Sequence, residues 1–231
     1  MTAACAHTIS LPLPAGMTGG VSALLQLPHA ATACFVLAHG AGAGMDNPSM
    51  VAVAEELADR SIATLRFQFP YMERHSRRPD PPSVCHATVR AAVAEAARLA
   101  PTLALFAGGR SFGGRMTSQA QALKPLPGVQ GLAFLGFPLH PAGKPSAERA
   151  EHLREVKIPM LFLQGTRDEL ANLELLQPLI DRLGARATLK LLQEADHSFH
   201  VPARTGRKDA EVRAEMLDAF AAWMELAIHT A

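Results

Sequence analysis

Short apolar runs alternate with longer helical stretches along most of this sequence, and no other feature constrains its fold as strongly. Strand-like apolar runs occupy residues 33–38, 62–67, 103–107, 132–135, 160–164 and 188–192. Helical spacing of hydrophobic residues predicts helices over residues 48–60, 83–99, 112–123, 173–183 and 207–228. Continuous apolar strands are typical of parallel sheets covered on both faces. We therefore predict an α/β fold, a mostly parallel, doubly wound sheet flanked by helices.

The remaining segments add an edge to this sheet and two long connections. Residues 10–13 and 21–27 are expected to form an N-terminal hairpin at the sheet edge, and residues 70–83 and 137–150 are expected to be loops. No linker-like stretch divides the 231 residues, so we expect a single domain over residues 1–231. No insertion is long enough for a large separate lid, which predicts an open site with a minimal lid.

The composition of the chain limits which binding partners and which cellular location we expect. Hydrophobic residues make up 48% of the chain and the net charge is +1, which gives no reason to expect nucleic acid or an anionic membrane as partner. The first basic residue is Arg60, so the start of the sequence does not resemble a signal peptide. Three widely spaced cysteines form neither a disulfide framework nor a metal site. We expect a cytoplasmic monomer or homodimer without a metal or cofactor.

One serine has the sequence context of a nucleophile. Ser111 lies in the pattern G-x-S-x-G formed by residues 109–113, directly after one predicted strand and directly before a predicted helix. A serine on such a sharp turn projects its hydroxyl at the carboxyl end of the sheet. The free N–H groups at the start of the following helix favour an oxyanion, and the N–H of Phe112 is the first candidate donor.

A serine hydroxyl is a weak nucleophile until a positioned base takes its proton. His197 follows the last predicted strand and is the candidate base, with His200 as the alternative. Asp168 follows the strand at residues 160–164 and is the candidate acid that orients the imidazole, with Glu169 as its neighbour. One candidate residue follows each of three predicted strands, and this placement predicts a Ser-His-Asp arrangement.

The glycine-rich segment at residues 39–44 follows the first buried strand. A loop at this place can supply the second oxyanion donor, for which Ala41 is the first choice and Gly42 the second. The spacing matches neither the dinucleotide nor the P-loop pattern, so nucleotide binding is disfavoured. His39 is expected to brace the loop.

Four segments together resemble a known family: residues 39–42, 67–72, 77–82 and 108–115. They are similar to the KANL3/Tex30-like branch of the α/β-hydrolases, which is related to the dienelactone hydrolase-like group. The resemblance extends from about Leu24 to Leu226. It implies an α/β-hydrolase fold of about eight strands and a triad of Ser111, Asp168 and His197. It supplies no substrate, and the serine argues against the activity of dienelactone hydrolases, which use cysteine.

The residues and the resemblance together predict a serine hydrolase that cleaves a small carboxylic ester or thioester. Arg110, Tyr71, Met72 and Leu139 are the candidate substrate-binding residues. Arg110 would pair with an anionic group of the substrate, or else be a solvated or structural arginine. Some members of this branch act as parts of larger assemblies, so the alternative is a non-catalytic interaction module on a hydrolase scaffold.

Overall fold

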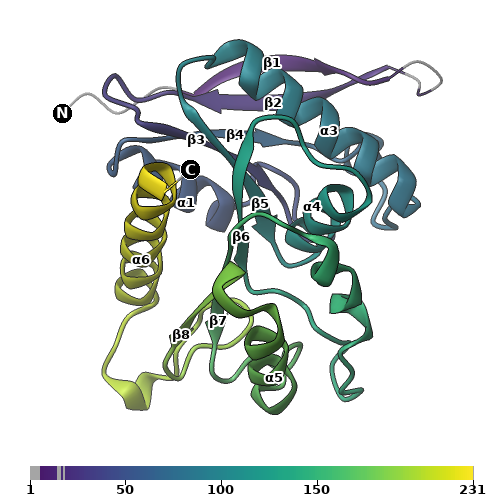
Figure 1. Cartoon of the computed structure of the whole chain (residues 1–231). Coiled ribbons are helices and arrows are strands. Elements are labelled where there is room, and N and C mark those ends of the chain that lie inside the picture. Colours follow the sequence, from purple (N-terminus) through teal and green to yellow (C-terminus); the bar gives the residue numbers. More distant parts are fainter. Residues whose placement is uncertain (1–5, 15–16, 18, 231) are drawn as a thin grey trace.

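An eight-stranded sheet forms the centre of the computed structural model, which describes residues 6–14, 17 and 19–230 (Figure 1). The strand order is β1-β2-β4-β3-β5-β6-β7-β8. The strands are β1 (Ala6–Pro12), β2 (Gly20–Gln26), β3 (Ala33–Ala38), β4 (Ile62–Phe67), β5 (Ala104–Arg110), β6 (Val129–Leu135), β7 (Met160–Gly165) and β8 (Ala187–Leu192). β2 pairs antiparallel with β1 and β4, and all other neighbours are parallel. The predicted mostly parallel sheet with an N-terminal edge hairpin is confirmed.

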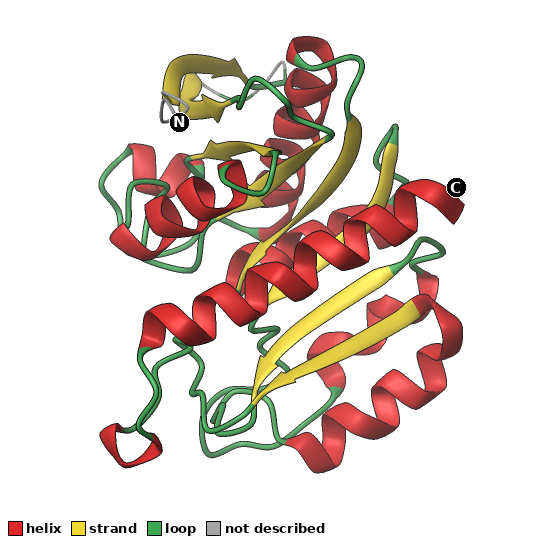
Figure 2. Cartoon of the chain, turned by 90° about the vertical axis from the view of Figure 1, so that its left-hand side faces the viewer, coloured by secondary structure: helices red, strands yellow, loops and turns green. Residues whose placement is uncertain are grey.

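Helices cover both faces of the sheet, and Figure 2 shows the long α6 lying across the strands. The helices are α1 (Pro48–Ala58), α2 (Pro70–Glu73), α3 (Pro82–Leu99), α4 (Phe112–Leu123), α5 (Leu173–Leu183) and α6 (Asp209–Thr230). Short 3₁₀ segments are η1 (Glu148–Glu155), η2 (Gly184–Arg186) and η3 (Ala203–Thr205). α1 and α6 pack on one face, and α3, α4, α5 and η1 pack on the other.

Alternate residues of the central strands face opposite sides of the sheet, and together they form the core. All six residues of β3 are buried. Phe35 and Leu37 pack in the cluster that holds α1 and α6, whereas Cys34 and Val36 pack in the cluster on the opposite face. Successive strand side chains point to opposite faces, so a strand covered on both sides must be apolar throughout.

β5 is longer than the sequence predicts, because it continues through Gly108, Gly109 and Arg110. Glycine permits this extension: a Cβ on Gly109 would lie 2.2 Å from the Ala38 carbonyl oxygen. The segment at 70–83 also differs from the prediction, since its first residues form the short helix α2 with Pro70 at the first position. The prediction of a loop missed one turn of helix there.

Two of the three cysteines lie within the described residues. Cys34 and Cys85 are buried free thiols, and burial raises the pKa of each to about 12. Cys5 lies outside the described residues. Among the described helices, none is both long and apolar enough to cross a membrane.

Candidate active site

Ser111 occupies a strained turn between β5 and α4. Its φ is +50° and its ψ is −117°, a conformation that residues other than glycine rarely adopt. Its backbone N–H donates to the Leu135 carbonyl at 3.2 Å, which ties the turn to β6. A Cβ on Gly113 would lie 2.5 Å from the Ala38 carbonyl oxygen. The glycine of the motif is therefore required because the first turn of α4 approaches the end of β3.

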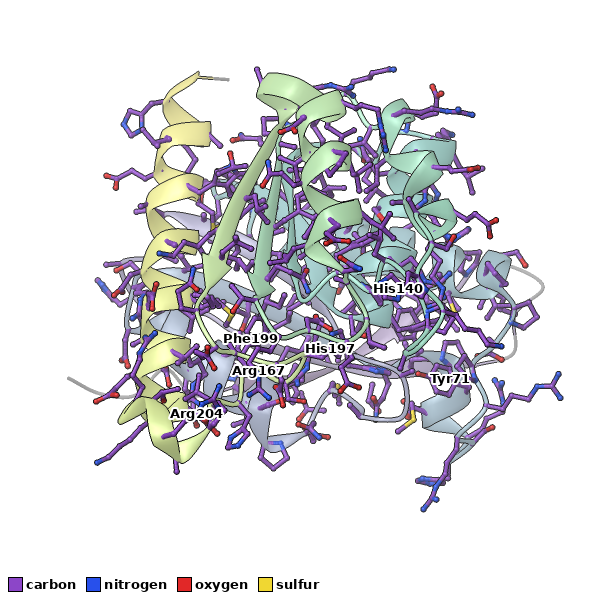
Figure 3. The ribbon with its side chains drawn as sticks, turned by 90° about the horizontal axis from the view of Figure 1, so that it is seen from below. Tyr71, His140, Arg167, His197, Phe199 and Arg204 are labelled. Atoms are coloured by element: carbon purple, nitrogen blue, oxygen red, sulfur yellow. The ribbon has the colours of Figure 1, made fainter. Side chains whose placement is uncertain are left out.

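The imidazole of His197 connects the two other predicted residues. Its Nε2 lies 2.8 Å from Ser111 Oγ, and its Nδ1 lies 2.7 Å from Asp168 Oδ2. Figure 3 shows His197 beyond the carboxyl ends of the strands, close to Phe199. The His197 side chain is 23% exposed and the Asp168 side chain is 0% exposed. One end of this hydrogen-bonded chain is therefore open to solvent and the other is enclosed by protein.

The Asp168 carboxylate accepts hydrogen bonds from three donors. His197 Nδ1 and Gln164 Nε2 both contact Oδ2, and the Leu170 N–H donates to Oδ1 at 2.8 Å. The other end of the fully buried Gln164 side chain accepts from the Phe137 N–H at 2.9 Å. Sequence reasoning missed Gln164. A polar residue inside the otherwise apolar strand at 160–164 was the signal, because buried amides require partners.

Gly136 is a second residue that the sequence analysis did not identify. It follows β6 with a φ of +73°, and a Cβ there would lie 3.4 Å from His197 Nδ1 and Cε1. Glycine satisfies both requirements, a left-handed backbone and space for the ring. Gly136 thus forms part of the wall against which the imidazole rests.

The side chain of Asp196 holds the loop that carries His197. Asp196 Oδ1 accepts from the N–H groups of Ser198 at 2.7 Å and His200 at 3.0 Å. Phe199 is buried and has a φ of +62°, an unusual angle for an aromatic residue. This turn directs His197 toward Ser111 and His200 away from it.

The alternative residues lie elsewhere. His200 is exposed, and its Nδ1 lies 2.9 Å from Asp209 Oδ2, so the pKa of His200 is raised by the hydrogen bond to that carboxylate. His140 bonds the backbone of Pro141 and Asn172. Glu169, the neighbour of Asp168, is exposed. None of these side chains contacts Ser111 or His197.

The two predicted oxyanion donors flank Ser111. Phe112 opens α4, and no hydrogen bond of the described residues engages its N–H or that of Ala41. A Cβ on the adjacent Gly40 would lie 3.9 Å from Ser111 Cβ, so the loop passes close to the serine. The N–H of Gly42 faces Tyr71 Oη at 3.4 Å. Of the two loop candidates, Ala41 therefore has the free N–H.

His39 holds the glycine-rich loop in place. Its Nε2 accepts from the Phe69 N–H at 3.1 Å, and its Nδ1 lies 2.8 Å from the Gly40 carbonyl oxygen. Burial lowers the pKa of His39, which favours the neutral ring that these two bonds need. The structure agrees with a bracing role for His39.

The candidate substrate-binding residues require a correction. Tyr71 and Leu139 are 0% exposed, because Tyr71 packs with Phe69 and Leu139 belongs to the main core cluster. Neither forms an open pocket wall. Met72 is half-buried, and its Cε would lie 3.5 Å from a Cβ on Gly44. Met72 thus borders the glycine-rich loop.

Arg110 has a partner within the protein. Its Nη1 donates to Ser49 Oγ at 2.6 Å, and burial lowers the pKa of its guanidinium, partly offset by the charge of Asp196. Arg74, in the segment after α2, forms an ion pair with Asp80 at 2.6 Å. No group of three or more His, Cys, Asp or Glu in the described segments could hold a metal ion.

Comparison with known proteins places this chain in a family. A model of the alpha/beta hydrolase domain matches residues 31–225. A serine hydrolase without a lid from Xanthomonas campestris superposes with a TM-score of 0.72 at 22% identity, covering 94% of each chain. A dienelactone hydrolase from Anabaena variabilis gives 0.76 at 21% identity, covering 96% of this chain and 97% of that one.

The esterase domain of a Rhodothermus marinus protein is similar too. Its TM-score is 0.70 at 17% identity, and the match covers 95% of this chain and 97% of that one. These likenesses extend over nearly the full length of each chain and show the same fold. The family match spans most of the sequence, from the residues before β3 to the last quarter of α6. The chain therefore belongs to the α/β hydrolase domain family and has the α/β-hydrolase fold.

Proposed function

We propose that this protein is a serine hydrolase that cleaves a small carboxylic ester or thioester. In this proposal Ser111 is the nucleophile, His197 the base and Asp168 the acid that orients the imidazole. The observation that carries it is the unbroken order of hydrogen bonds from Ser111 Oγ through His197 to Asp168, at 2.8 and 2.7 Å. Family membership and the esterase-like neighbours support a hydrolase.

In the first step Ser111 Oγ attacks the substrate carbonyl carbon, and its proton moves to His197 Nε2. The carbonyl oxygen becomes an oxyanion that accepts from the N–H groups of Phe112 and Ala41. Collapse of this intermediate breaks the C–O or C–S bond. His197 gives its proton to the departing alkoxide or thiolate, and the acyl group remains on Ser111.

In the second step a water molecule attacks the acyl-enzyme. His197 Nε2 takes a proton from the water, and the second oxyanion uses the same two donors. The bond between the acyl carbon and Ser111 Oγ breaks, the serine regains the proton, and a carboxylic acid leaves. Throughout, the Asp168 carboxylate stabilises the imidazolium through Nδ1.

The surroundings of Ser111 support a small substrate reached from solvent. Ser111 and His197 are half-buried, and Met72 borders the glycine-rich loop beside them. We propose Met72 as a contact for the substrate. Arg110 is proposed to act structurally through Ser49, since its guanidinium is already bound there. Membership of the KANL3/Tex30-like branch is proposed on the segments quoted above.

A panel of esters and thioesters, run with the wild type and Ser111→Ala, tests the proposal. Turnover should fall by on the order of 10⁶-fold in Ser111→Ala. A fluorophosphonate probe should label the wild type at Ser111. Ser83→Ala, at an exposed serine in the first turn of α3, should label and turn over like the wild type. Absence of labelling in folded protein would instead favour the non-catalytic interaction module.

A further inference from the structure

Arg115 projects from the first turn of α4, and its guanidinium lacks a hydrogen-bond acceptor. Within the described residues it takes part in no ion pair, and its Nε is buried without any partner. A guanidinium carries five N–H donors in a planar fork, and buried donors are almost always paired. Its one side-chain contact of note is with the Phe112 ring, 5.7 Å from the guanidinium carbon to the ring centroid.

A second arginine without an acceptor stands nearby. Arg149, in η1, forms no ion pair or side-chain hydrogen bond among the described residues. The pKa of the Arg115 guanidinium is lowered, mainly by burial and secondly by the positive charge of Arg149. No carboxylate is among the groups that shift the pKa of Arg115. Among the described residues, no carboxylate forms an ion pair with either guanidinium group.

A hydrogen bond joins the two elements that carry these arginines. Ser118 Oγ lies 2.9 Å from the Arg115 carbonyl oxygen and 2.8 Å from His152 Nε2. His152 follows Arg149 by three residues in η1. Ser118 is buried, so α4 and η1 are joined at this point. The helical segments that carry the two arginines are therefore packed against each other at this point.

The pair lies beside the proposed active site. The Arg115 N–H donates to the Ser111 carbonyl at 3.1 Å, so the backbone of Arg115 lies one helical turn from the proposed nucleophile. The same guanidinium rests on Phe112, whose N–H is the proposed oxyanion donor. One substrate molecule could therefore place an anionic group at Arg115 and its carbonyl group at Ser111.

We propose that Arg115 and Arg149 form a binding site for a phosphate-type dianion. Two guanidinium forks match the several oxygens and double charge of a phosphate better than a single carboxylate. The source is either a phosphate on the alcohol or thiol part of the substrate, or free inorganic phosphate. Only the first source rests on the proposed hydrolase function.

Direct titration with inorganic phosphate at constant ionic strength tests the site without any assay of activity. Binding to the wild type should be saturable, and Arg115→Met and Arg149→Gln should each weaken it by about tenfold or more, since charged hydrogen bonds are lost. Arg115→Met keeps an apolar stem on Phe112, and a thermal unfolding scan confirms that it is folded. Arg154→Gln is the matched control, because Arg154 shares η1 but pairs with Glu155 at 3.4 Å.

Kinetics then separate the two sources. Two esters with the same acyl group, one with a phosphate on its alcohol and one neutral, are compared in the wild type and in Arg149→Gln. A substrate phosphate predicts a KM about tenfold higher in Arg149→Gln for the phosphorylated ester only, with kcat unchanged. Saturable phosphate binding without such a preference supports the site and identifies the free anion as its ligand.

Two results would overturn the site. One is the absence of saturable phosphate binding by the wild type, and the other is binding by Arg115→Met and Arg149→Gln as strong as that of Arg154→Gln. A failure of the hydrolase proposal is distinguishable, because it would abolish turnover of every ester and leave the phosphate titration unaffected.

Discussion

Gln164 and His197 donate to the same oxygen of Asp168. The Gln164 side chain spans from this carboxylate to the Phe137 N–H, so one buried amide connects the proposed acid with the segment after β6. Gly136, next to Phe137, lies beside the imidazole of His197, since a Cβ added there would be 3.4 Å from Nδ1 and Cε1. Gln164 therefore orients Asp168 and supports the wall behind the ring at the same time.

We predict that Gln164→Glu shifts the pH dependence of activity. The variant keeps an oxygen for the Phe137 N–H but replaces the donor to Asp168 with a second carboxyl group. When both carboxyl groups are ionised, the added negative charge favours the protonated imidazole. The acidic limb of the kcat/KM profile should therefore move to higher pH, as measured by steady-state kinetics with one ester.

The control for this change is Gln121→Glu. Gln121 is also buried, and its Oε1 accepts from the Leu126 N–H at 2.7 Å, at the far end of α4. Gln121→Glu also introduces a carboxyl group at a buried position, but this position does not contact the proposed site. If the profiles of both variants coincide with that of the wild type, Gln164 has no influence on the base.

Gly136→Ala should separate a backbone effect from an effect on the imidazole. A left-handed conformation costs alanine about 1–2 kcal/mol, and the new Cβ would press on His197. Gly143→Ala provides the control, because Gly143 has a φ of +69° and a Cβ added there would meet no atom within 4 Å. Both variants should lose similar stability in chemical denaturation, and only Gly136→Ala should lower kcat. An equal kcat for the two would contradict the prediction.

Asp168→Asn should lower kcat by on the order of 10⁴-fold, because an amide no longer stabilises the imidazolium or enforces its tautomer. Glu169→Gln changes the neighbouring exposed carboxyl and should behave like the wild type. Single-turnover and steady-state rates on one ester measure both. A large loss in Glu169→Gln with little in Asp168→Asn would show that the acid had been assigned to the wrong residue.

His152 should make the protein less stable at acidic pH. Burial, followed by the charges of Arg115 and His86, lowers the pKa of His152 from 6.5 to about 4. Between these values the unfolded chain binds a proton that the folded protein does not, so the free energy of unfolding falls as the pH falls. His152→Gln cannot titrate and should show a shallower decline in this window.

Urea unfolding at a series of pH values measures this difference. His229→Gln is the control, at an exposed histidine near the end of α6, and should follow the wild type. Equal slopes for the wild type and His152→Gln between about pH 6.5 and 4 would show that His152 does not contribute.

The sequence alone predicted the architecture, which the structure confirms, and the residues of the proposed site, since both predictions depend on local patterns. Apolar periodicity identifies β3, β4 and the helix α4 because burial acts on each segment separately. The G-x-S-x-G turn identifies Ser111 because only glycine tolerates its close backbone contacts. His197 and Asp168 follow from topology, because parallel strands bring their carboxyl ends to one edge.

Only the tertiary structure decided which side chains meet around those residues. The donors to Asp168, the contact of Gly136 with His197 and the neighbouring charges of Arg115 and Arg149 join segments far apart in the chain. The burial of Tyr71 and Leu139 depends on packing from several elements at once. The direction of a side chain and the number of its neighbours follow from three-dimensional packing, which no local pattern in the sequence encodes.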